Sequence, residues 1–320
     1  MSDAYAGLPV LLTGATGLIG SHLALALLDR GAEVHALIVP EDLPGSLLDR
    51  SGRLHQIRRH AGRLEDPAAV RQAVSAARPA VVFHLGAQTQ VQAARQDPVA
   101  TFEANVAGTW QLLEACRAQA TAPMAIAVAS SDKAYGKSDD LPYRETHPLA
   151  GSEPYEVSKS MTDLLAQTYA RAYGLPTRIA RCGNVYGAGD RNWERIVPGT
   201  IRSLLAGERP IIRSDGTPVR DYVHVADVVD AYLRLGCDPI APGTAYNFSS
   251  GERASVLEVV SLIGAAAGSS LAPIVQGDAP GELAAQYLDA TKARSELGWR
   301  PTRRLADSLP EIIAWYRAAG

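Results

Sequence analysis

The first half of the chain alternates short apolar runs with longer stretches whose apolar residues recur at helical spacing. The runs "LPVLLT", "AEVHALIV" and "AVVFHL" are typical of strands, and "GLIGSHLALALLDRG" and "DPAAVRQAVSAA" are typical of helices. Strands that alternate with helices in this way form right-handed βαβ units and a parallel sheet. Because the strands lack polar alternation, we expect helices on both faces. The sequence therefore predicts an α/β fold with a doubly wound parallel sheet.

This pattern continues to about Gly187 and then changes to a loop-rich region. "APMAIAVAS" is predicted to be a fifth strand, "EPYEVSKSMTDLLAQTYARAYG" a long helix and "LPTRIARCGNVYG" a sixth strand. Gly31 is expected to end the first helix, and Asp66 with Pro67 to begin a later one. Residues 1–187, with a returning segment near 222–250, are predicted to form the larger lobe. Residues 188–320 are predicted to form mainly a smaller lobe, with ligands bound in the cleft between the two.

Composition argues against several classes of partner. The 320 residues carry a net charge of −3, which gives no reason to expect nucleic acid or an anionic membrane. Cys116, Cys182 and Cys237 show neither metal-ligand spacing nor a disulfide framework, so we predict no metal site and a reducing compartment. The N-terminal residues lack a signal-peptide pattern, and no apolar run approaches the roughly 20 residues that span a bilayer. We therefore expect a cytoplasmic protein.

A glycine-rich segment joins the first strand to its helix. "TGATGLIG" contains Gly14, Gly17 and Gly20, together with Thr16, Leu18 and Ile19. Glycines allow the tight turn and let backbone N–H groups approach a pyrophosphate at the helix N-terminus. This setting favours a dinucleotide site over a simple glycine-rich turn. Glu41 and Asp42 follow the second strand slightly late for a ribose-binding carboxylate, and no arginine follows at once, so NAD is favoured over NADP.

Tyr155 and Lys159 lie four residues apart in "YEVSK", and therefore on one face of the predicted helix. A lysine cation near a phenol favours the phenolate, which a general base for alcohol oxidation requires. The spacing is common, and a packed tyrosine beside a solvated lysine is the alternative. Ser130 and Ser131 end the fifth strand, so their hydroxyls, the glycine loop and this pair should meet at the carboxyl edge of the sheet.

At this point the chain resembles an extended short-chain dehydrogenase/reductase of the nucleotide-sugar epimerase and dehydratase group. "TGATGLIG", "VFHLGAQ", "NVAGT", "PYEVSK", "ARCGNVYG" and "VRDYVHVADVV" match that group's motifs in order, and "YNFSSGERASVLEVV" and "YLDATKARSELGWRP" match its C-terminal lobe. The resemblance implies a Rossmann lobe that holds NAD(P), a smaller lobe that binds a nucleoside diphosphate sugar, and a homodimer built on helices that include the Tyr155 helix. The cofactor-binding residues that it implies are Gly14, Thr16, Gly17, Leu18, Ile19, Gly20, Gly86, Gln88, Asn105, Ser130, Tyr155 and Lys159.

The two branches of that group share their first step. The hydroxyl at the Ser131 position bonds to the sugar O4, the tyrosine removes the O4 proton, and C4 gives hydride to the nicotinamide. Epimerases then rotate the 4-keto sugar and return hydride to its other face. The 4,6-dehydratases instead eliminate water across C5 and C6, which requires a further acid and a further base.

The segment "SSDKAYG" is most similar to CDP-glucose 4,6-dehydratases, as are "GAQTQVQAARQDP" and "GNVYGAGDRNWERIVP". This likeness implies Asp132 as the acid. Lys133 would be the base at C5 or, if charged, would stabilise the enolate-like intermediate. Adjacent strand residues point to opposite faces, so both side chains can reach one sugar only if the strand has already ended. The alternative is that Asp132 is a turn residue and Lys133 is solvated.

Other residues match the substrate-binding positions of the group. Asn184 and Arg220 match residues that bind the diphosphate, for which an arginine fork is well suited. Gln88 is also expected to contact the substrate. Arg191 and Asn192 lie in a loop that is expected to cover the nucleotide, although an exposed loop charge is the alternative for Arg191.

Two further positions bear on these assignments. Arg63 stands where the group usually has an aspartate that contacts adenine, which weakens any transfer of adenine contacts. Tyr135 and Tyr186 are interpreted as packing residues and not as catalysts.

The sequence thus predicts an NAD-dependent nucleoside diphosphate hexose 4,6-dehydratase whose catalytic residues are Ser131, Asp132, Lys133, Tyr155 and Lys159. The alternative is a nucleotide-sugar 4-epimerase of the UDP-sugar type, which would use only Ser131, Tyr155 and Lys159. A regulatory protein that binds NAD(P) without turnover is a third hypothesis, disfavoured by the intact proton-transfer residues. The nucleotide base and the hexose are left open.

Overall fold

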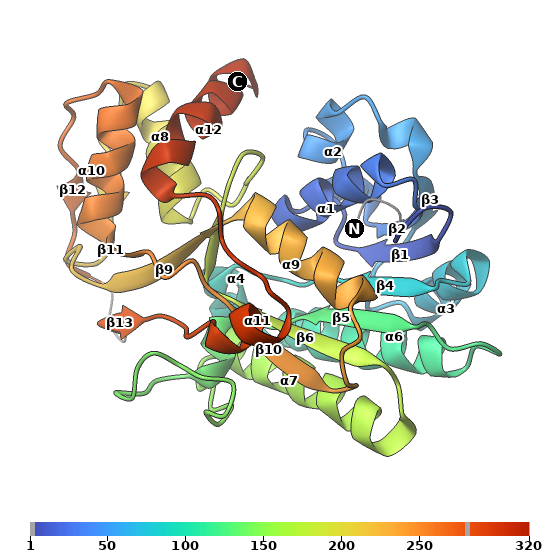
Figure 1. The fold of residues 1–320 in the computed structure, drawn as a ribbon. Helices are drawn as coiled ribbons and strands as arrows, with labels where there is room; N and C mark the ends of the chain where they lie inside the picture. Colours follow the sequence, from blue (N-terminus) through green and yellow to red (C-terminus); the bar gives the residue numbers. More distant parts are fainter. Residues whose placement is uncertain (1–3, 279–281, 320) are drawn as a thin grey trace. The chain divides into compact units, whose positions relative to one another are not determined.

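The computed structural model describes residues 4–278 and 282–319. Within these residues the main sheet has seven strands in the order β10-β6-β5-β4-β1-β2-β3 (Figure 1). The neighbours from β6 to β3 pair in parallel. This order confirms the predicted doubly wound parallel sheet. Its strands are β1 Pro9–Thr13, β2 Glu33–Ile38, β3 Arg58–Ala61, β4 Val81–His84, β5 Ala125–Ala129, β6 Thr177–Cys182 and β10 Thr244–Phe248.

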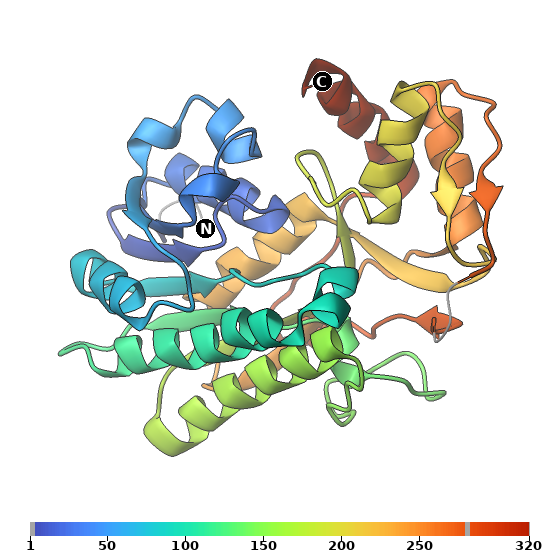
Figure 2. The ribbon, with the colours of Figure 1, turned by 180° about the vertical axis from the view of Figure 1, so that it is seen from behind.

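Helices cover both faces of this sheet, as expected for strands without polar alternation. Helices α1 and α9 lie on one face, and α3, α6 and α7 lie on the other (Figures 1 and 2). Their bounds are α1 Leu18–Asp29, α3 Pro67–Ala77, α6 Gly108–Arg117, α7 Pro154–Tyr173 and α9 Val225–Cys237. Shorter helical segments are η1 Pro40–Asp42, α2 Leu47–Arg50, η2 Leu54–Gln56, α4 Val91–Gln96, α5 Pro98–Phe102, the π-helical η3 Glu103–Ala107 and the 3-10 turn η4 Asp132–Tyr135.

Local chemistry explains two of the predicted helix boundaries. Gly31, just beyond α1, has a φ of +73°, the left-handed conformation that glycine adopts without strain. The Asp66 carboxylate accepts hydrogen bonds from the N–H groups of Ala68 and Ala69, and Pro67 is the first residue of α3. Both boundaries agree with the sequence prediction.

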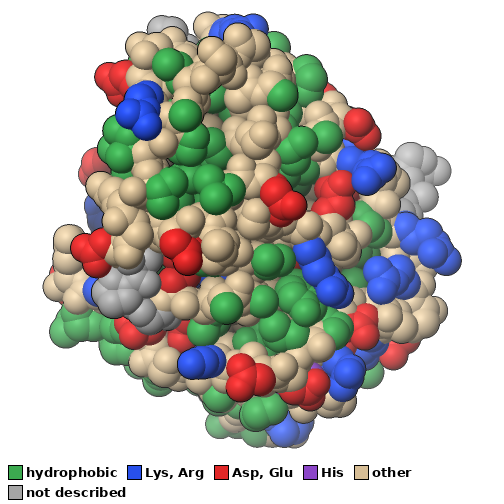
Figure 3. All heavy atoms as spheres, turned by 90° about the vertical axis from the view of Figure 1, so that its left-hand side faces the viewer, with side chains coloured by type: hydrophobic (Ala, Val, Ile, Leu, Met, Phe, Trp, Pro, Cys, Tyr) green, Lys and Arg blue, Asp and Glu red, His purple; other side chains and the backbone are tan. Residues whose placement is uncertain are grey.

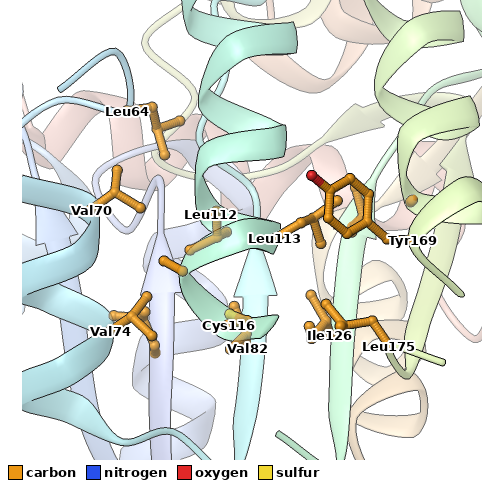
Figure 4. Packing of buried hydrophobic residues seen from close by; sticks show 14 of the residues in the cluster. Leu64, Val70, Val74, Val82, Leu112, Leu113, Cys116, Ile126, Tyr169 and Leu175 are labelled. Carbon is orange, nitrogen blue, oxygen red and sulfur yellow. The ribbon is translucent and has the colours of Figure 1, made fainter. Parts of the chain in front are cut away.

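The larger apolar core lies between the sheet and the layer formed by α3, α6 and α7. Figure 4 shows side chains of α3 and α6 directed toward the strands behind them. Burial of each large apolar side chain contributes about 1.5–3 kcal/mol. This packing fixes α6 and α7 against the sheet. The labelled members of the cluster include Val70, Val74, Val82, Leu112, Leu113, Cys116, Ile126 and Tyr169.

The predicted sixth strand is wrong in its extent. The segment from Thr177 divides at Gly183 into β6, which joins the main sheet, and β7 Asn184–Tyr186, which pairs with β9 Val219–His224. A Cβ at Gly183 would lie 3.2 Å from the Asp221 side chain, so a glycine is favoured at this close approach. Periodicity alone does not reveal such a change of sheet, because a single glycine, Gly183, separates the two strands.

The chain divides into two compact units. Unit 1 comprises residues 1–137, 145–181 and 229–246, and unit 2 comprises residues 138–144, 182–228 and 247–320. In unit 2, β9 pairs with β7, β11 Arg253–Ser255 and β13 Ala285–Gln286, and β8 Ile211–Ile212 pairs with β12 Ile274–Val275. The helices of unit 2 are α8 Ile196–Leu205, α10 Val256–Ala267, α11 Thr291–Glu296 and α12 Leu305–Ala319. The predicted functions of two lobes, and a cleft between them, stay predictions.

Unit 2 has its own apolar core, formed by side chains of α8, α10 and α12 with Tyr186 and Tyr222. On the face that carries α10 and β12, hydrophobic side chains gather at the surface (Figure 3). They include Leu257, Leu262, Ile274 and Val275. Among the residues that the structure describes, no helix has the length and apolar character needed to cross a membrane.

Candidate active site

The glycine loop connects β1 to α1 in unit 1. Gly14 has a φ of +72°, and a Cβ there would lie 2.7 Å from the backbone nitrogen of Gly86. A Cβ at Gly20 would lie 2.0 Å from the Gly14 carbonyl oxygen. Only glycine fits at either position, because any side chain would collide with backbone atoms. The loop, the start of α1 and Gly86 are therefore held in close contact.

The N-terminus of α1 is suited to an anion. Gly17 precedes the helix and provides no side-chain cap, so the first N–H groups of α1 lack acceptors within the helix. These groups belong to Leu18, Ile19 and Gly20, and Thr16 lies half-buried beside them. Backbone donors at the positive end of a helix fit a pyrophosphate. The residues present thus fit a bound dinucleotide.

Glu41, a candidate ribose-binding carboxylate, and Arg63, which stands where the resemblance implies an adenine-contacting aspartate, are both exposed. Glu41 lies in η1 after β2, and Arg63 follows β3, the neighbouring strand. The Arg63 Nη2 lies 3.5 Å from the Glu41 Oε2. A carboxylate and a guanidinium therefore stand together near the position where a Rossmann protein distinguishes a ribose hydroxyl from a 2′-phosphate.

The strand β5 ends at Ala129, before Asp132 and Lys133. The Ser131 hydroxyl accepts a hydrogen bond from the Lys133 N–H at 3.2 Å and caps the turn η4. It donates to the Asp132 Oδ1 at 2.9 Å, and the Lys133 Nζ lies 3.7 Å from the same oxygen. Asp132 is only 1% exposed, whereas the Lys133 side chain is 25% exposed. The three side chains therefore form one cluster on a turn. Because the strand has already ended, the alternation of strand side chains between opposite faces does not separate them.

Ser130 lies between the strand and this turn. Its N–H donates to the Ala180 carbonyl oxygen at 2.8 Å, which keeps it beside β6. Its hydroxyl oxygen is buried and has no hydrogen-bond partner within the described residues. Leaving a buried hydroxyl unpaired costs about 1–3 kcal/mol, so a ligand atom at this position would be stabilising.

Helix α7 places Tyr155 and Lys159 beside the same segment. Both residues are buried, and the Lys159 Nζ donates to the Ala129 carbonyl oxygen at 3.0 Å. The Ser160 hydroxyl donates to the Ala134 carbonyl oxygen at 2.8 Å. Helix α7 is thus bonded to the end of β5 and to η4, so the structure brings the serine cluster and the tyrosine helix together.

A buried polar chain not foreseen from the sequence runs behind this site. The Thr13 Oγ1 lies 2.9 Å from the His84 Nδ1, and the Thr109 Oγ1 lies 3.0 Å from the His84 Nε2. Thr109 donates its proton to the Asn105 carbonyl oxygen, so Nε2 must be the protonated nitrogen of a neutral His84. Burial, and then the charge of Lys159, lower the pKa of His84 to about 3. A polar residue inside the apolar run "AVVFHL" is the signal that could have indicated this chain.

Asn105 links three elements through its side chain. Its Oδ1 accepts from the Gln88 N–H at 2.7 Å, and its Nδ2 donates to the Gln88 carbonyl oxygen and to the Ser158 Oγ, each at 2.9 Å. Both amide hydrogens are therefore engaged, and Asn105 fixes the segment after β4 to α7. A direct contact of Asn105 or Gln88 with a ligand stays a prediction.

The remaining predicted residues lie in unit 2. Asn184 is on β7, and its Nδ2 donates to the Asp221 carbonyl oxygen at 3.2 Å. On the adjacent strand β9, Arg220 pairs with Glu282 at 3.0 Å. Arg191 is exposed, and the Asn192 N–H donates to Asp190 in the loop that precedes α8. Asn184 and Arg220 are thus on neighbouring strands, and their roles stay predictions.

The fold and the glycine loop define the class of protein to which this chain belongs. A parallel sheet in this order with a glycine turn after β1 is a Rossmann domain, and the solved structures of short-chain dehydrogenases/reductases share it. The crystal structure of UDP-glucose 4-epimerase from Thermotoga maritima with UDP-glucose has a TM-score of 0.87 and 28% identity, covering 97% of this chain and 98% of that one. That of dTDP-glucose 4,6-dehydratase from Streptomyces venezuelae, with NAD bound, has a TM-score of 0.84 and 27% identity, covering 97% of both chains.

Sequence comparison narrows this class to one family. The family model described as GDP-mannose 4,6 dehydratase matches residues 11–312. CDP-glucose 4,6-dehydratase of Salmonella typhimurium is 29% identical, covering 98% of this chain and 92% of its own, and UDP-glucose 4-epimerase of Mycolicibacterium smegmatis is 32% identical, covering 96% and 98%. A dTDP-glucose 4,6-dehydratase of Streptomyces antibioticus is 33% identical, covering 96% and 92%. The chain belongs to the extended short-chain dehydrogenase/reductase family of nucleotide-sugar dehydratases and epimerases.

These relatives include both branches at similar identity. Membership therefore supports an enzyme of this superfamily, but it does not choose between elimination and epimerisation.

Proposed function

We propose that this protein is an NAD-dependent nucleoside diphosphate hexose 4,6-dehydratase. The observation that carries the proposal is the buried Asp132 carboxylate, bonded to the Ser131 hydroxyl and 3.7 Å from the Lys133 ammonium. A 4-epimerase needs a hydroxyl, a base and a lysine, but it has no departing water to protonate. A carboxyl group buried beside the O4-binding serine is what elimination requires.

The cofactor assignment rests on the fit of the glycine loop and on relatives crystallised with NAD. When bound, NAD accepts the C4 hydride of the sugar and later returns it. The N–H groups of α1 would hold its pyrophosphate, Lys159 would bond to the nicotinamide ribose, and Glu41 would favour NAD over NADP. The nicotinamide end of the cofactor would be lined by Gly86, Ser130 and the hydrogen-bonded pair of Gln88 and Asn105.

Oxidation at C4 is assigned to three side chains. Tyr155 removes the O4 proton as the C4–H bond breaks, and Lys159 stabilises the resulting phenolate. Ser131 donates a hydrogen bond to O4. Ser131 contacts the Asp132 Oδ1, so a Ser131 hydroxyl that turns to O4 would leave the Asp132 carboxyl group to act on the C6 hydroxyl. The product of this step is a 4-keto sugar.

Elimination is assigned to the turn η4. The 4-keto group acidifies the C5 proton. In this step Asp132 holds the one proton of the Asp132–Lys133 pair, and neutral Lys133 removes the C5 proton. Asp132 gives its proton to the C6 hydroxyl, which leaves as water. Hydride then adds to C6 and a proton to C5, so the product is lighter than the substrate by one water.

Unit 2 is assigned to the nucleoside diphosphate. We propose that Arg220 and Asn184, on adjacent strands, bind the diphosphate, and that Arg191 and Asn192 contact the nucleotide, with Gln88 of unit 1 near the sugar. A diphosphate bound there would take the place of Glu282 as a partner of the Arg220 guanidinium. The similarity to CDP-glucose 4,6-dehydratase supports a CDP-hexose as the first substrate to test.

The second candidate is a nucleotide-sugar 4-epimerase. The 32% identity to UDP-glucose 4-epimerase of Mycolicibacterium smegmatis favours it. On this hypothesis Ser131, Tyr155 and Lys159 carry the whole reaction, and Asp132 and Lys133 only shape the turn.

The deciding experiment is mass spectrometry of products after incubation with NAD and CDP-, GDP-, UDP- and dTDP-hexoses. Loss of one water establishes the dehydratase and identifies its nucleotide. A new stereoisomer of unchanged mass establishes the epimerase. Absence of turnover with every sugar would favour a regulatory, non-catalytic protein.

Replacing Asp132 with Asn tests the acid directly. The amide keeps the size of the side chain but has no proton of suitable acidity, so we expect dehydration to fall by about 100-fold or more. Reduced nicotinamide should still form, because C4 oxidation does not use Asp132. An Asp132→Asn enzyme that dehydrates at the wild-type rate would contradict the assignment.

A homodimer and a cytoplasmic location also stay predictions. Support for the dimer comes from apolar side chains exposed on α6 and α7, namely Trp110, Met161 and Leu164.

A further inference from the structure

Arg181 is a buried arginine that the chemistry above does not use. It lies on β6, is only 2% exposed, and its guanidinium forms a fork with Asp163 of α7. The Nε and Nη2 atoms donate to the two carboxylate oxygens at 2.7 and 2.9 Å. Asp163 is fully buried and also accepts from Gln167, so each carboxylate oxygen is paired within unit 1.

The third nitrogen of the same guanidinium reaches the catalytic turn. The Arg181 Nη1 donates to the Tyr135 hydroxyl at 2.8 Å, and the guanidinium carbon lies 4.9 Å from the centre of the Tyr135 ring. Tyr135 is the last residue of η4, which begins with Asp132. It is therefore more than the packing residue expected from the sequence. One planar cation joins the turn to the tyrosine helix.

The positions of these residues suit this link. Tyr155, Lys159 and Asp163 are spaced by four residues and so share one face of α7. Arg181 bonds to the third of them and, through Tyr135, to the turn that carries Ser131, Asp132 and Lys133. Burial by itself lowers the pKa of Arg181, but the hydrogen bonds and charge of Asp163 outweigh it and hold that pKa above its ordinary value. The cation therefore persists over the working pH range.

Stability alone does not account for this pair. Burying an arginine and a carboxylate costs several kcal/mol per ion, and well-packed apolar residues often replace such a pair without loss. A fork with a third donor supplies orientation, because its planar donors fix two groups, the Asp163 carboxylate and the Tyr135 hydroxyl, relative to each other. A second bond between α7 and η4 runs from the Ser160 hydroxyl to the Ala134 carbonyl oxygen, and it holds the backbone of the turn without engaging the Tyr135 side chain.

We propose that Arg181 is a positioning residue that holds the turn Asp132–Tyr135 at a fixed orientation to Tyr155 and Lys159. It contacts neither sugar nor cofactor, and it acts through Tyr135 and Asp163. Because C4 oxidation depends mainly on α7 and elimination depends on the turn, loosening this link should slow elimination more than oxidation. This division of the two phases rests on the proposed dehydratase function.

The test is a stopped-flow single turnover of the NAD-bound enzyme with a substrate hexose, with reduced nicotinamide followed by absorbance. We expect Tyr135→Phe to slow the decay of reduced nicotinamide by about tenfold, the equivalent of one lost charged hydrogen bond, while its formation, which uses Ser131 of the same turn, slows by about threefold. Arg181→Lys, which loses the fork, should show the same pattern with a larger effect. The matched control is Tyr5→Phe, which removes another buried tyrosine hydroxyl bond, from Tyr5 to the Leu233 carbonyl oxygen.

The outcomes separate the inference from the proposed function. Wild-type product mass decides between dehydratase and epimerase without reference to Arg181. If the wild type proves an epimerase, the dehydratase proposal fails by itself, and Tyr135→Phe should still turn over about threefold more slowly than Tyr5→Phe, because Ser131 caps the turn and serves C4 oxidation. Tyr135→Phe rates within about twofold of those of Tyr5→Phe, whichever product forms, would overturn the positioning role, and this variant decides even if Arg181→Lys fails to fold.

Discussion

His84 is expected to make the stability of this protein depend on pH. Its ring is buried between the hydroxyls of Thr13 and Thr109, and burial with the charge of Lys159 lowers its pKa from 6.5 to about 3. In the unfolded chain the imidazole takes up a proton below about pH 6.5, whereas in the native state it stays neutral until about pH 3. Between those values the unfolded state binds more protons, so the native state loses stability as the pH falls.

The size of this pH dependence follows from the difference in bound protons between the unfolded and the native state. One such group removes up to about 1.4 kcal/mol of unfolding free energy for each pH unit within that window. We expect urea unfolding of the wild type, measured at about pH 7, pH 6 and pH 5, to show this loss in addition to the contributions of other groups. His84→Gln cannot titrate, so its unfolding free energy should fall more gently, by about 1 kcal/mol less between pH 6 and pH 5.

The quantity to compare between variants is the slope of the unfolding free energy against pH. His84→Gln is expected to be less stable than the wild type at about pH 7, because glutamine cannot bond to Thr13 and Thr109 with the same geometry. The exposed His55→Gln variant is the control and should follow the wild-type slope. Parallel curves for the wild type and His84→Gln would refute the assignment of a neutral, buried His84.

Two further predictions concern the cofactor and the assembly. Glu41→Gln should raise the affinity for NADP relative to NAD by up to about fivefold in a fluorescence titration, because it frees Arg63 from an exposed ion pair that contributes about 1 kcal/mol or less. Arg63→Gln should shift the ratio the other way, and an unchanged ratio in both variants would contradict a role for this pair. Met161→Glu combined with Leu164→Glu should convert a dimer to a monomer in light scattering, since it places charges on the exposed apolar face of α7. Leu262→Glu, on exposed α10, is the control, and a dimer that survives both changes would exclude this face.

Local patterns in the sequence predicted the strands and helices well. The apolar runs before Gly14 and Gly86 are the strands β1 and β4, and the Asp66-Pro67 pair begins α3 as expected. Each of these features depends on residues within a few positions of one another. The glycine loop was predictable for the same reason, because the tight approach of Gly14 and Gly20 is a property of the loop itself.

Other parts of the site depend on residues far apart in the chain. Arg181 meets Tyr135 across 46 positions and Asp163 across 18, and no periodicity relates these three residues. Because adjacent residues of a strand point to opposite faces, the sequence left open whether Asp132 and Lys133 could reach one ligand. That uncertainty is removed by the Ser131 cap, which depends on a side-chain hydrogen bond that residue spacing does not reveal.

The two activities found in this family share the oxidation of C4 and differ in the fate of the 4-keto sugar. In this chain the residues proposed for C4 oxidation are Tyr155 and Lys159 on α7 and Ser131, which caps the turn η4. Asp132 and Lys133, proposed for elimination, are the first two residues of that turn. A 4-keto sugar that forms while the turn is misplaced has no acid to release its C6 hydroxyl. Hydride can then return only to C4, on the original face or, after rotation of the sugar, on the other. On the proposed function, the orientation of a short turn would separate a dehydratase from an epimerase on one scaffold, and relatives of both kinds have similar identity to this chain.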